Sequence, residues 1–166
     1  MRVKGKRPGI TAEAKSSASP QKQIDSFLAK YAPKMQKLAR AALAKMRKRL
    51  PNAVEMVYDN YNALVFGFSP NERPSDAIFS IALYPDHGAL CFLQGAKLPD
   101  PHKRLRGSGN VVRNVRVEDT KVLDDPQIVA LMDEALERAK VQMDPNQKRQ
   151  LVIRSVSAKQ RPRRPS

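Results

Sequence analysis

The sequence predicts one α+β domain, in which an antiparallel meander sheet of about five strands is packed on one face by two N-terminal helices and one C-terminal helix. Residues 24–50 place apolar side chains at helical spacing, and residues 54–117 change to alternation, with turn residues between short runs. Residues 126–142 return to the helical period. At 166 residues and 41% hydrophobic composition, the chain suffices for one modest core.

Two helices are predicted near the N-terminus. Ile24, Phe27 and Leu28 recur at helical spacing, and Pro33 ends that short helix. The second helix covers residues 34–49 and is amphipathic. One arc carries Met35, Leu38, Ala39, Ala42, Leu43, Met46 and Leu50, and the opposite arc carries Lys34, Lys37, Arg40, Lys45, Arg47, Lys48 and Arg49.

The middle of the chain predicts strands, because apolar residues alternate between turn signals. The first strand places Val54, Met56 and Tyr58 on one side. The five predicted strands cover residues 54–58, 64–68, 79–83, 89–93 and 111–117. Between the last two, Asp100-Pro101 has the pattern of a helix cap, which predicts a short helical turn over residues 101–106.

The closing helix begins at Asp125-Pro126 and extends to about Gln142, and Asp144-Pro145 follows it. Residues 151–156 are a candidate short strand, whereas residues 157–166 are too basic and proline-rich to pack. The predicted organisation is therefore a disordered basic arm, a domain and a basic tail, at residues 1–22, 23–144 and 145–166.

The formal net charge is +15, and its distribution is uneven. Residues 1–22 hold six basic residues and one acid, and residues 145–166 hold seven basic residues and no acid. Residues 34–49 add seven cations and no acid. The rest of residues 23–144 has more acidic than basic side chains and is mildly acidic. This pattern predicts binding to an acidic polymer, most simply nucleic acid, without sequence preference.

A set of residues spread over residues 24–139 resembles the YdhG-like family of bacterial domains, which largely lack an assigned function. The residues that carry the resemblance are Leu50-Pro51, Glu55, Tyr58, Gly95-Ala96, Asp100-Pro101, Leu105, Gly107, Gly109 and Arg113. The family is grouped with frataxin-like domains, and some relatives are described as intracellular iron chaperones. The resemblance thus implies an α+β fold and, as an alternative function, iron binding.

No catalytic signature is present, which predicts a binding module rather than an enzyme, with no cofactor. The chain lacks a G-x-S-x-G elbow, and its two histidines, His87 and His102, lie in polar turn-like segments. Cys91 lies in an apolar run and is predicted to be a small buried hydrophobe. Without a long apolar run or a secretory signal, the sequence predicts a cytoplasmic protein and no membrane partner.

The candidate nucleic-acid contacts come from the basic helix and the basic tail. They are Lys34, Lys37, Arg40, Lys45, Lys48, Arg161, Arg163 and Arg164. The other interpretation of the same residues is a solvated helix face and a tail that aids solubility. No oligomeric state is predicted.

A second candidate site is an anion cradle at a glycine turn. Gly107 and Gly109 follow a basic stretch and lie between Arg106 and Arg113, so backbone N–H groups and guanidinium groups could hold a phosphate or carboxylate. The alternative is a turn that only positions the chain.

The iron alternative requires oxygen ligands. The acidic candidates are Glu55, Asp59, Glu72, Asp76 and Asp86, and they are scattered without ligand spacing. This alternative predicts that iron binding weakens when Glu55 and Asp59 are neutralised.

Overall fold

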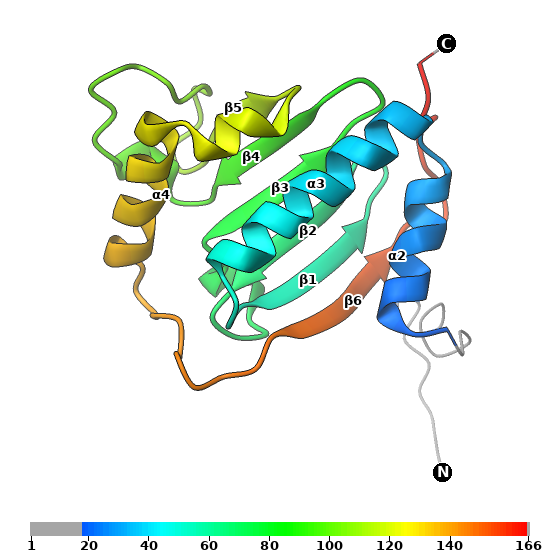
Figure 1. The fold of residues 1–166 in the computed structure, drawn as a ribbon, viewed down its shortest axis with the longest axis horizontal. Helices are drawn as coiled ribbons and strands as arrows, with labels where there is room; N and C mark the ends of the chain where they lie inside the picture. The colour runs from blue at the N-terminus through cyan, green and yellow to red at the C-terminus, as the bar shows by residue number, and fades with distance from the viewer. Residues whose placement is uncertain (1–17, 166) are drawn as a thin grey trace.

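A computed structural model describes residues 18–165 and confirms the α+β class, with helices packed on a sheet (Figure 1). The sheet has the order β5-β4-β3-β2-β1-β6, and all neighbours are antiparallel except the parallel pair β1 and β6. The helices are α2 (Pro20–Ala29), α3 (Pro33–Arg49) and α4 (Pro126–Arg138), with 3₁₀ turns η1 (Pro74–Asp76), η2 (Gly95–Lys97) and η3 (Thr120–Asp124). The strands are β1 (Val54–Asp59), β2 (Leu64–Ser69), β3 (Phe79–Leu83), β4 (Gly88–Phe92), β5 (Arg113–Val117) and β6 (Gln150–Val156).

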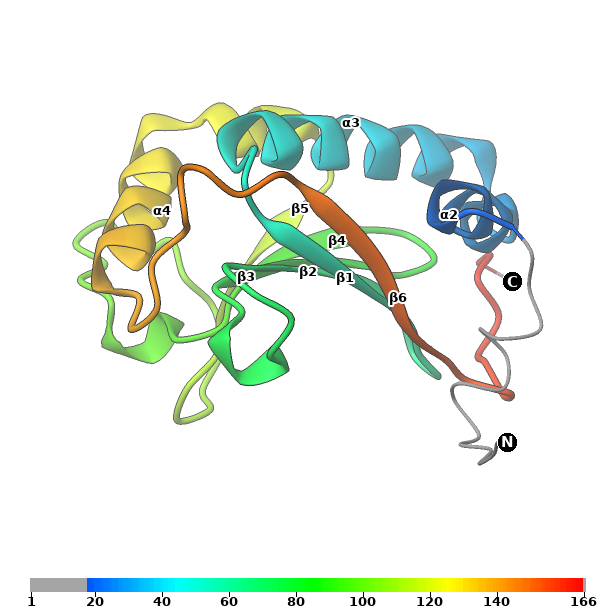
Figure 2. The same ribbon diagram turned by 90° about the horizontal axis from the view of Figure 1, so that it is seen from below.

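The helices cover one face of the sheet. Figure 2 shows α3 lying over the strands, with α2 beside β6 at one end of α3 and α4 at the other end. Each of the three helices has a proline at its first position, where no intrahelical N–H donor is needed. Ser19 caps α2 and Asp125 caps α4 through side-chain oxygens, whereas the N-cap of α3, Ala32, has no side chain able to cap.

The main core lies between α3 and the sheet, and alternate strand residues point into it. Phe66, Phe79 and Phe92 are fully buried there, and the rings of Phe79 and Phe92 meet edge to face with centroids 5.6 Å apart. Glu55 and Asp59 share this helix-covered face with Val57, because they alternate with it along β1. Two acidic side chains therefore lie inside the main core.

A smaller apolar cluster occupies the other face of the sheet. It is built from Val54, Met56 and Ala77, with Tyr58, Leu93 and Val152 packed against it. Cys91 is half-buried, and burial raises the pKa of its thiol. The thiol is consequently less readily ionised than a free cysteine, as expected for a small structural residue.

One predicted helical turn and two predicted boundaries are wrong. Residues 101–106 form no helix, because the Asp100 carboxylate accepts hydrogen bonds from the backbone N–H groups of Arg104 and Leu105, which folds the chain into a tight turn instead. The helix α4 ends at Arg138 rather than near Gln142. Because α2 begins at Pro20, the domain starts inside the predicted N-terminal arm, whose residues 1–17 lie outside the described residues.

The predicted tail is also wrong, since residues 150–165 are built into the domain. The candidate strand is present as β6, and it pairs in parallel with β1 from Gln150 to Val156. The residues that follow pack against the turn between β1 and β2 and against α2. In the described part of the chain, no helix combines the length and apolar character needed to cross a bilayer.

Tyr31 gives the fold a predicted alkaline sensitivity. Its side chain is fully buried, its hydroxyl donates to the Leu83 carbonyl at 2.7 Å, and burial raises its pKa to about 12. A pKa above the unfolded value of about 10 means that folding favours the neutral phenol; this stabilisation is complete below about pH 10 and is lost between about pH 10 and 12. We expect Tyr31 to account for about 2–3 kcal/mol of the fall in unfolding free energy across that window. Denaturant unfolding at pH 9 and pH 12 should therefore show a smaller fall in Tyr31→Phe than in the unmodified chain, and an equal fall would contradict the assignment.

Candidate polyanion-binding surface

The segment after β6, residues 157–165, is called the strap here because it ties β6 back to α2. The backbone N–H of Ser157 donates to the Asp59 carbonyl at 2.8 Å, and the backbone N–H of Arg161 donates to the Tyr61 carbonyl at 2.9 Å. Arg164 reaches α2, where its Nε donates to the Lys30 carbonyl at 3.2 Å. The strap is thus an irregular segment packed against the domain, although its composition predicted an unpacked tail.

One buried arginine anchors the strap. Arg163 is only 4% exposed, and its Nη2 lies 2.9 Å from Asp59 Oδ1 and 2.5 Å from the Asn60 carbonyl oxygen. Its Nη1 donates to the Tyr61 carbonyl at 3.3 Å, and its guanidinium lies over the Tyr31 ring, 5.8 Å from the centroid. Arg163 therefore neutralises a buried carboxylate, and its prediction as a phosphate contact is corrected.

Several cations of α3 are also occupied by acidic partners. Arg40 pairs with Asp25 at 3.0 Å, and hydrogen bonds from Gln21 and then from Arg40 lower the pKa of that carboxyl group. Lys45 pairs with Asp124, whose pKa is lowered by this hydrogen bond first. Two of the predicted phosphate contacts on α3, Arg40 and Lys45, thus already have counter-charges.

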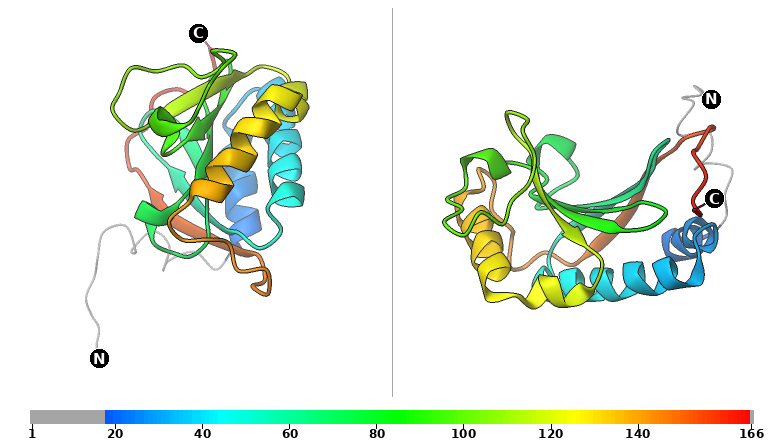
Figure 3. Two further views of the ribbon diagram at one scale, coloured as in Figure 1. Left: turned by 90° about the vertical axis from the view of Figure 1, so that its left-hand side faces the viewer. Right: turned by 90° about the horizontal axis from the view of Figure 1, so that it is seen from above.

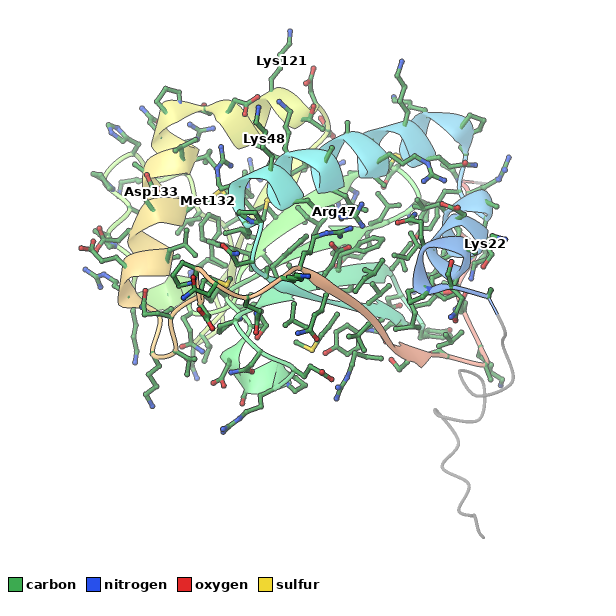
Figure 4. All side chains as sticks on the ribbon, turned by 60° about the horizontal axis from the view of Figure 1, so that its bottom comes forward. Lys22, Arg47, Lys48, Lys121, Met132 and Asp133 are labelled. Carbon is green, nitrogen blue, oxygen red and sulfur yellow. The ribbon has the colours of Figure 1, made fainter. Side chains whose placement is uncertain are left out.

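Arg47 lies on the inner side of the basic arc. Its Nε and Nη2 donate to the two carboxylate oxygens of Glu55 at 2.8 and 2.7 Å, and Arg149 lies 3.5 Å from the same carboxylate. Figure 4 shows Arg47 between α3 and the strands, while Lys48 points away from the helix. Adjacent residues of one helix face thus have different roles, one structural and one exposed.

Three predicted contacts on α3 remain without an acidic partner within residues 18–165: Lys34, Lys37 and Lys48. All three are exposed. Lys34 and Lys48 are 14 residues apart, which corresponds to about 21 Å along a helix. Lys48 is therefore separate from the pair at the start of α3.

The start of α3 and the strap meet at one corner of the molecule. The strap ends beside the connection between α2 and α3, as Figures 1 and 3 show, and Lys30 Nζ donates to the Gln160 side chain at 2.6 Å across this junction. The basic corner is defined as the exposed cations on the two segments, which are Lys34, Lys37, Lys159, Arg161 and Arg164. None of the five has an acidic partner within 4.0 Å among the described residues. Four of the five, all except Lys159, are among the phosphate contacts predicted from the sequence. The sequence alone placed these four on a helix and on a separate tail, and it did not predict that the two segments meet.

A groove of about 490 Å³ borders the basic corner on the side that faces β5. Lys34, Lys37 and apolar residues of α3 form one wall, and Asp86, Glu118 and Asp119 contribute to the other. The Asp86 carboxylate is hydrogen-bonded to His87, which lowers its pKa and keeps it charged. An acidic wall repels phosphate, so a polyanion would extend from α3 toward the strap rather than toward β5.

At the glycine turn, Arg113 binds the loop itself. Its Nη1 donates to the carbonyls of Gly109 and Val112 at 2.6 and 2.9 Å. Gly107 has a φ of 120°, a backbone conformation that favours glycine. The backbone N–H of Arg106 donates to the Asn114 carbonyl, and the N–H of Asn114 donates to the Arg106 carbonyl. The loop turns carbonyl oxygens toward Arg113. This geometry favours the interpretation as a turn that only positions the chain, and it disfavours an anion cradle.

Two of the five carboxylates named for iron, Glu55 and Asp59, are already engaged by cations. Asp59 accepts from Arg163 and from Lys30 Nζ at 2.6 Å, and Glu55 is held by Arg47. Both carboxylates are at most 1% exposed. Within residues 18–165, no group of three or more His, Cys, Asp or Glu residues is placed to hold a metal ion.

Comparison with known proteins identifies no relative. No family model matches the chain, and no curated protein and no solved structure matches it. The YdhG-like resemblance therefore remains a prediction based on the residues that carry it.

Proposed function

We propose that the protein is a non-catalytic binding module for a polyanion, most simply nucleic acid, and that the basic corner is its contact surface. The observation that carries the proposal is the meeting of two cationic segments, 34–37 and 159–164, that lie more than 100 residues apart in the sequence. Five exposed cations there have no acidic partner among the described residues. Solubility depends on net charge and does not require the cations to cluster, whereas clustered cations attract a polyanion to one surface.

The geometry supports phosphate contacts and does not support base recognition. Arg161 and Arg164 flank the buried Arg163, so the segment that carries them is ordered before any ligand binds. Pre-ordering lowers the entropy lost on binding. Among residues 18–165, Tyr61 is the one exposed aromatic residue, and a single exposed ring is too few for a stacking platform. The expected binding is therefore independent of sequence and sensitive to salt.

The test is fluorescence anisotropy of labelled duplex DNA and duplex RNA with the full chain across a salt series. We expect log affinity to fall linearly with log salt concentration. In the corner variant, Lys37→Gln/Arg161→Gln/Arg164→Gln, we expect the magnitude of the slope to fall by about 3, since each lost phosphate contact removes about one unit.

The matched control is Lys97→Gln/Lys121→Gln/Lys140→Gln, which removes the same charge from exposed lysines in or beside η2, η3 and α4. We expect this control to retain nearly all of the slope. Equal loss in both variants would show diffuse attraction to the whole chain rather than a surface. No binding at low salt by the unmodified chain would overturn the proposal.

A further inference from the structure

The contacts of Arg163 resemble those of a ligand in a pocket. The residue lies in a segment without regular secondary structure, and each of its partners belongs to another part of the fold: Tyr31 after α2, Asp59 at the end of β1, and Asn60 and Tyr61 in the next turn. A buried carboxylate, two carbonyl oxygens and an aromatic face together match the charge, the donors and the flat surface of a guanidinium group.

Residues 161–165 of the strap are held chiefly by this one side chain, whereas Ser157 and Gln160 attach its first part to Asp59 and Lys30. Lys159, Arg161, Pro162, Arg164 and Pro165 are all exposed, and Arg163 between them is buried. The remaining contacts of residues 161–165 are one backbone hydrogen bond from Arg161 and one side-chain hydrogen bond from Arg164. The attachment of this part of the strap is thus concentrated in one arginine, as in an anchored peptide.

The pocket walls are fixed independently of the strap. The Tyr31 hydroxyl is bonded to the Leu83 carbonyl, and Asp59 is paired in the sheet with Leu64 of β2 and Val156 of β6. Lys30 also pairs with Asp59, so the carboxylate keeps one counter-charge when Arg163 leaves. A vacated pocket would therefore retain both its shape and its acidic group.

We propose that this pocket is an arginine-recognition site for an irregular, proline-flanked basic segment, filled here by the chain's own Arg163 and open to the same segment of a second copy once the strap is displaced. The two terminal guanidinium nitrogens are the groups recognised, because Nη1 and Nη2 find acceptors while the buried Nε has none among the described residues. A lysine ammonium also has three donors, but it carries them on one compact nitrogen and cannot reproduce the separation of Nη1 and Nη2 or the flat contact with the Tyr31 ring. The inference does not depend on the proposed polyanion binding.

The experiment uses the full chain carrying Arg163→Ala, which empties the pocket, and a fluorescein-labelled peptide of residues 157–165 as the probe. Fluorescence anisotropy is expected to show saturable binding to this variant and none to the unmodified chain, whose own strap has a high effective concentration. The same peptide with Arg163→Lys is expected to bind at least about 10-fold more weakly. A net charge of +15 repels a basic peptide, so nonspecific attraction does not imitate the expected result.

The matched control is Arg161→Ala, which removes one charge from the same strap and leaves the pocket filled. It is expected to bind no peptide. A folded Arg163→Ala chain that binds no peptide, or that binds the arginine and lysine peptides equally, would overturn the proposal.

If Arg163→Ala does not fold, a cleavable chain answers the same question. A protease site inserted between the exposed residues Ala158 and Lys159 is cut after folding. The proposal expects the released fragment to remain bound in gel filtration and to exchange with the labelled peptide. Immediate loss of the fragment without peptide uptake would overturn the proposal.

Discussion

Arg47→Met is expected to lower the free energy of unfolding by about 3–5 kcal/mol, the range for breaking a buried ion pair from one side. The variant leaves Glu55, which is 1% exposed, with only Arg149 at 3.5 Å. Glu55 lies on β1 beneath α3, and neither element can turn the carboxylate toward water without opening the core. Urea unfolding followed by circular dichroism measures the loss.

Two controls make this prediction specific to the buried pair. The double variant Arg47→Met/Glu55→Leu removes both charges, and we expect it to recover most of the loss, since apolar replacements of a buried pair are often neutral or stabilising. Lys48→Met removes the adjacent exposed cation and is expected to change stability by less than about 0.5 kcal/mol. If Arg47→Met costs no more than Lys48→Met, the pair has no structural role.

The same pair explains why one part of the site could not be predicted. The amphipathic pattern correctly predicted α3, and it placed Arg47 and Lys48 together on a basic face. Periodicity assigns a residue to an arc, but it does not reveal whether a charged group at the edge of that arc meets an acid beneath the helix. That depends on Glu55, which the sequence offered as an iron ligand.

The orientation of β1 shows a related limit. Alternation correctly predicted that Val54, Met56 and Tyr58 share one side of the strand, yet this side faces the smaller cluster rather than the helices. The helix-covered side carries Glu55, Val57 and Asp59. Acidic residues usually mark a solvated face, and here Arg47 of the preceding helix and Arg163 of the strap neutralise them in the interior.

The strap and β6 were the least predictable parts, because their partners are remote in sequence. Arg163 pairs with Asp59, 104 residues earlier, and β6 pairs in parallel with β1. Composition correctly described residues 157–165 as basic and rich in proline, which disfavours a core but does not prevent one side chain from docking. Local patterns therefore predicted the hairpin-linked strands well and the non-local closure poorly.

Asp59→Ala is the second large expected effect, at about 3 kcal/mol, and its distinguishing feature is where structure is lost. The substitution removes the counter-charge of two cations, Lys30 and the buried Arg163. Arg163, unlike Arg47, lies on a segment outside the helices and strands, so undocking of the strap relieves the uncompensated charge and keeps the cost toward the lower end of the range.

This difference is measurable by hydrogen exchange. In the unmodified chain, the amides of Ser157 and Arg161 are hydrogen-bonded to the carbonyls of Asp59 and Tyr61 and should be protected. In Asp59→Ala we expect these two amides to exchange rapidly, while amides of β2 and β3 keep their order of protection. Asp25→Ala is the control, because its partner Arg40 is 49% exposed and the pair should contribute less than about 1 kcal/mol. Retained protection of the strap in Asp59→Ala would mean that the backbone bonds hold the segment without its arginine, and the anchoring role of Arg163 would then be wrong.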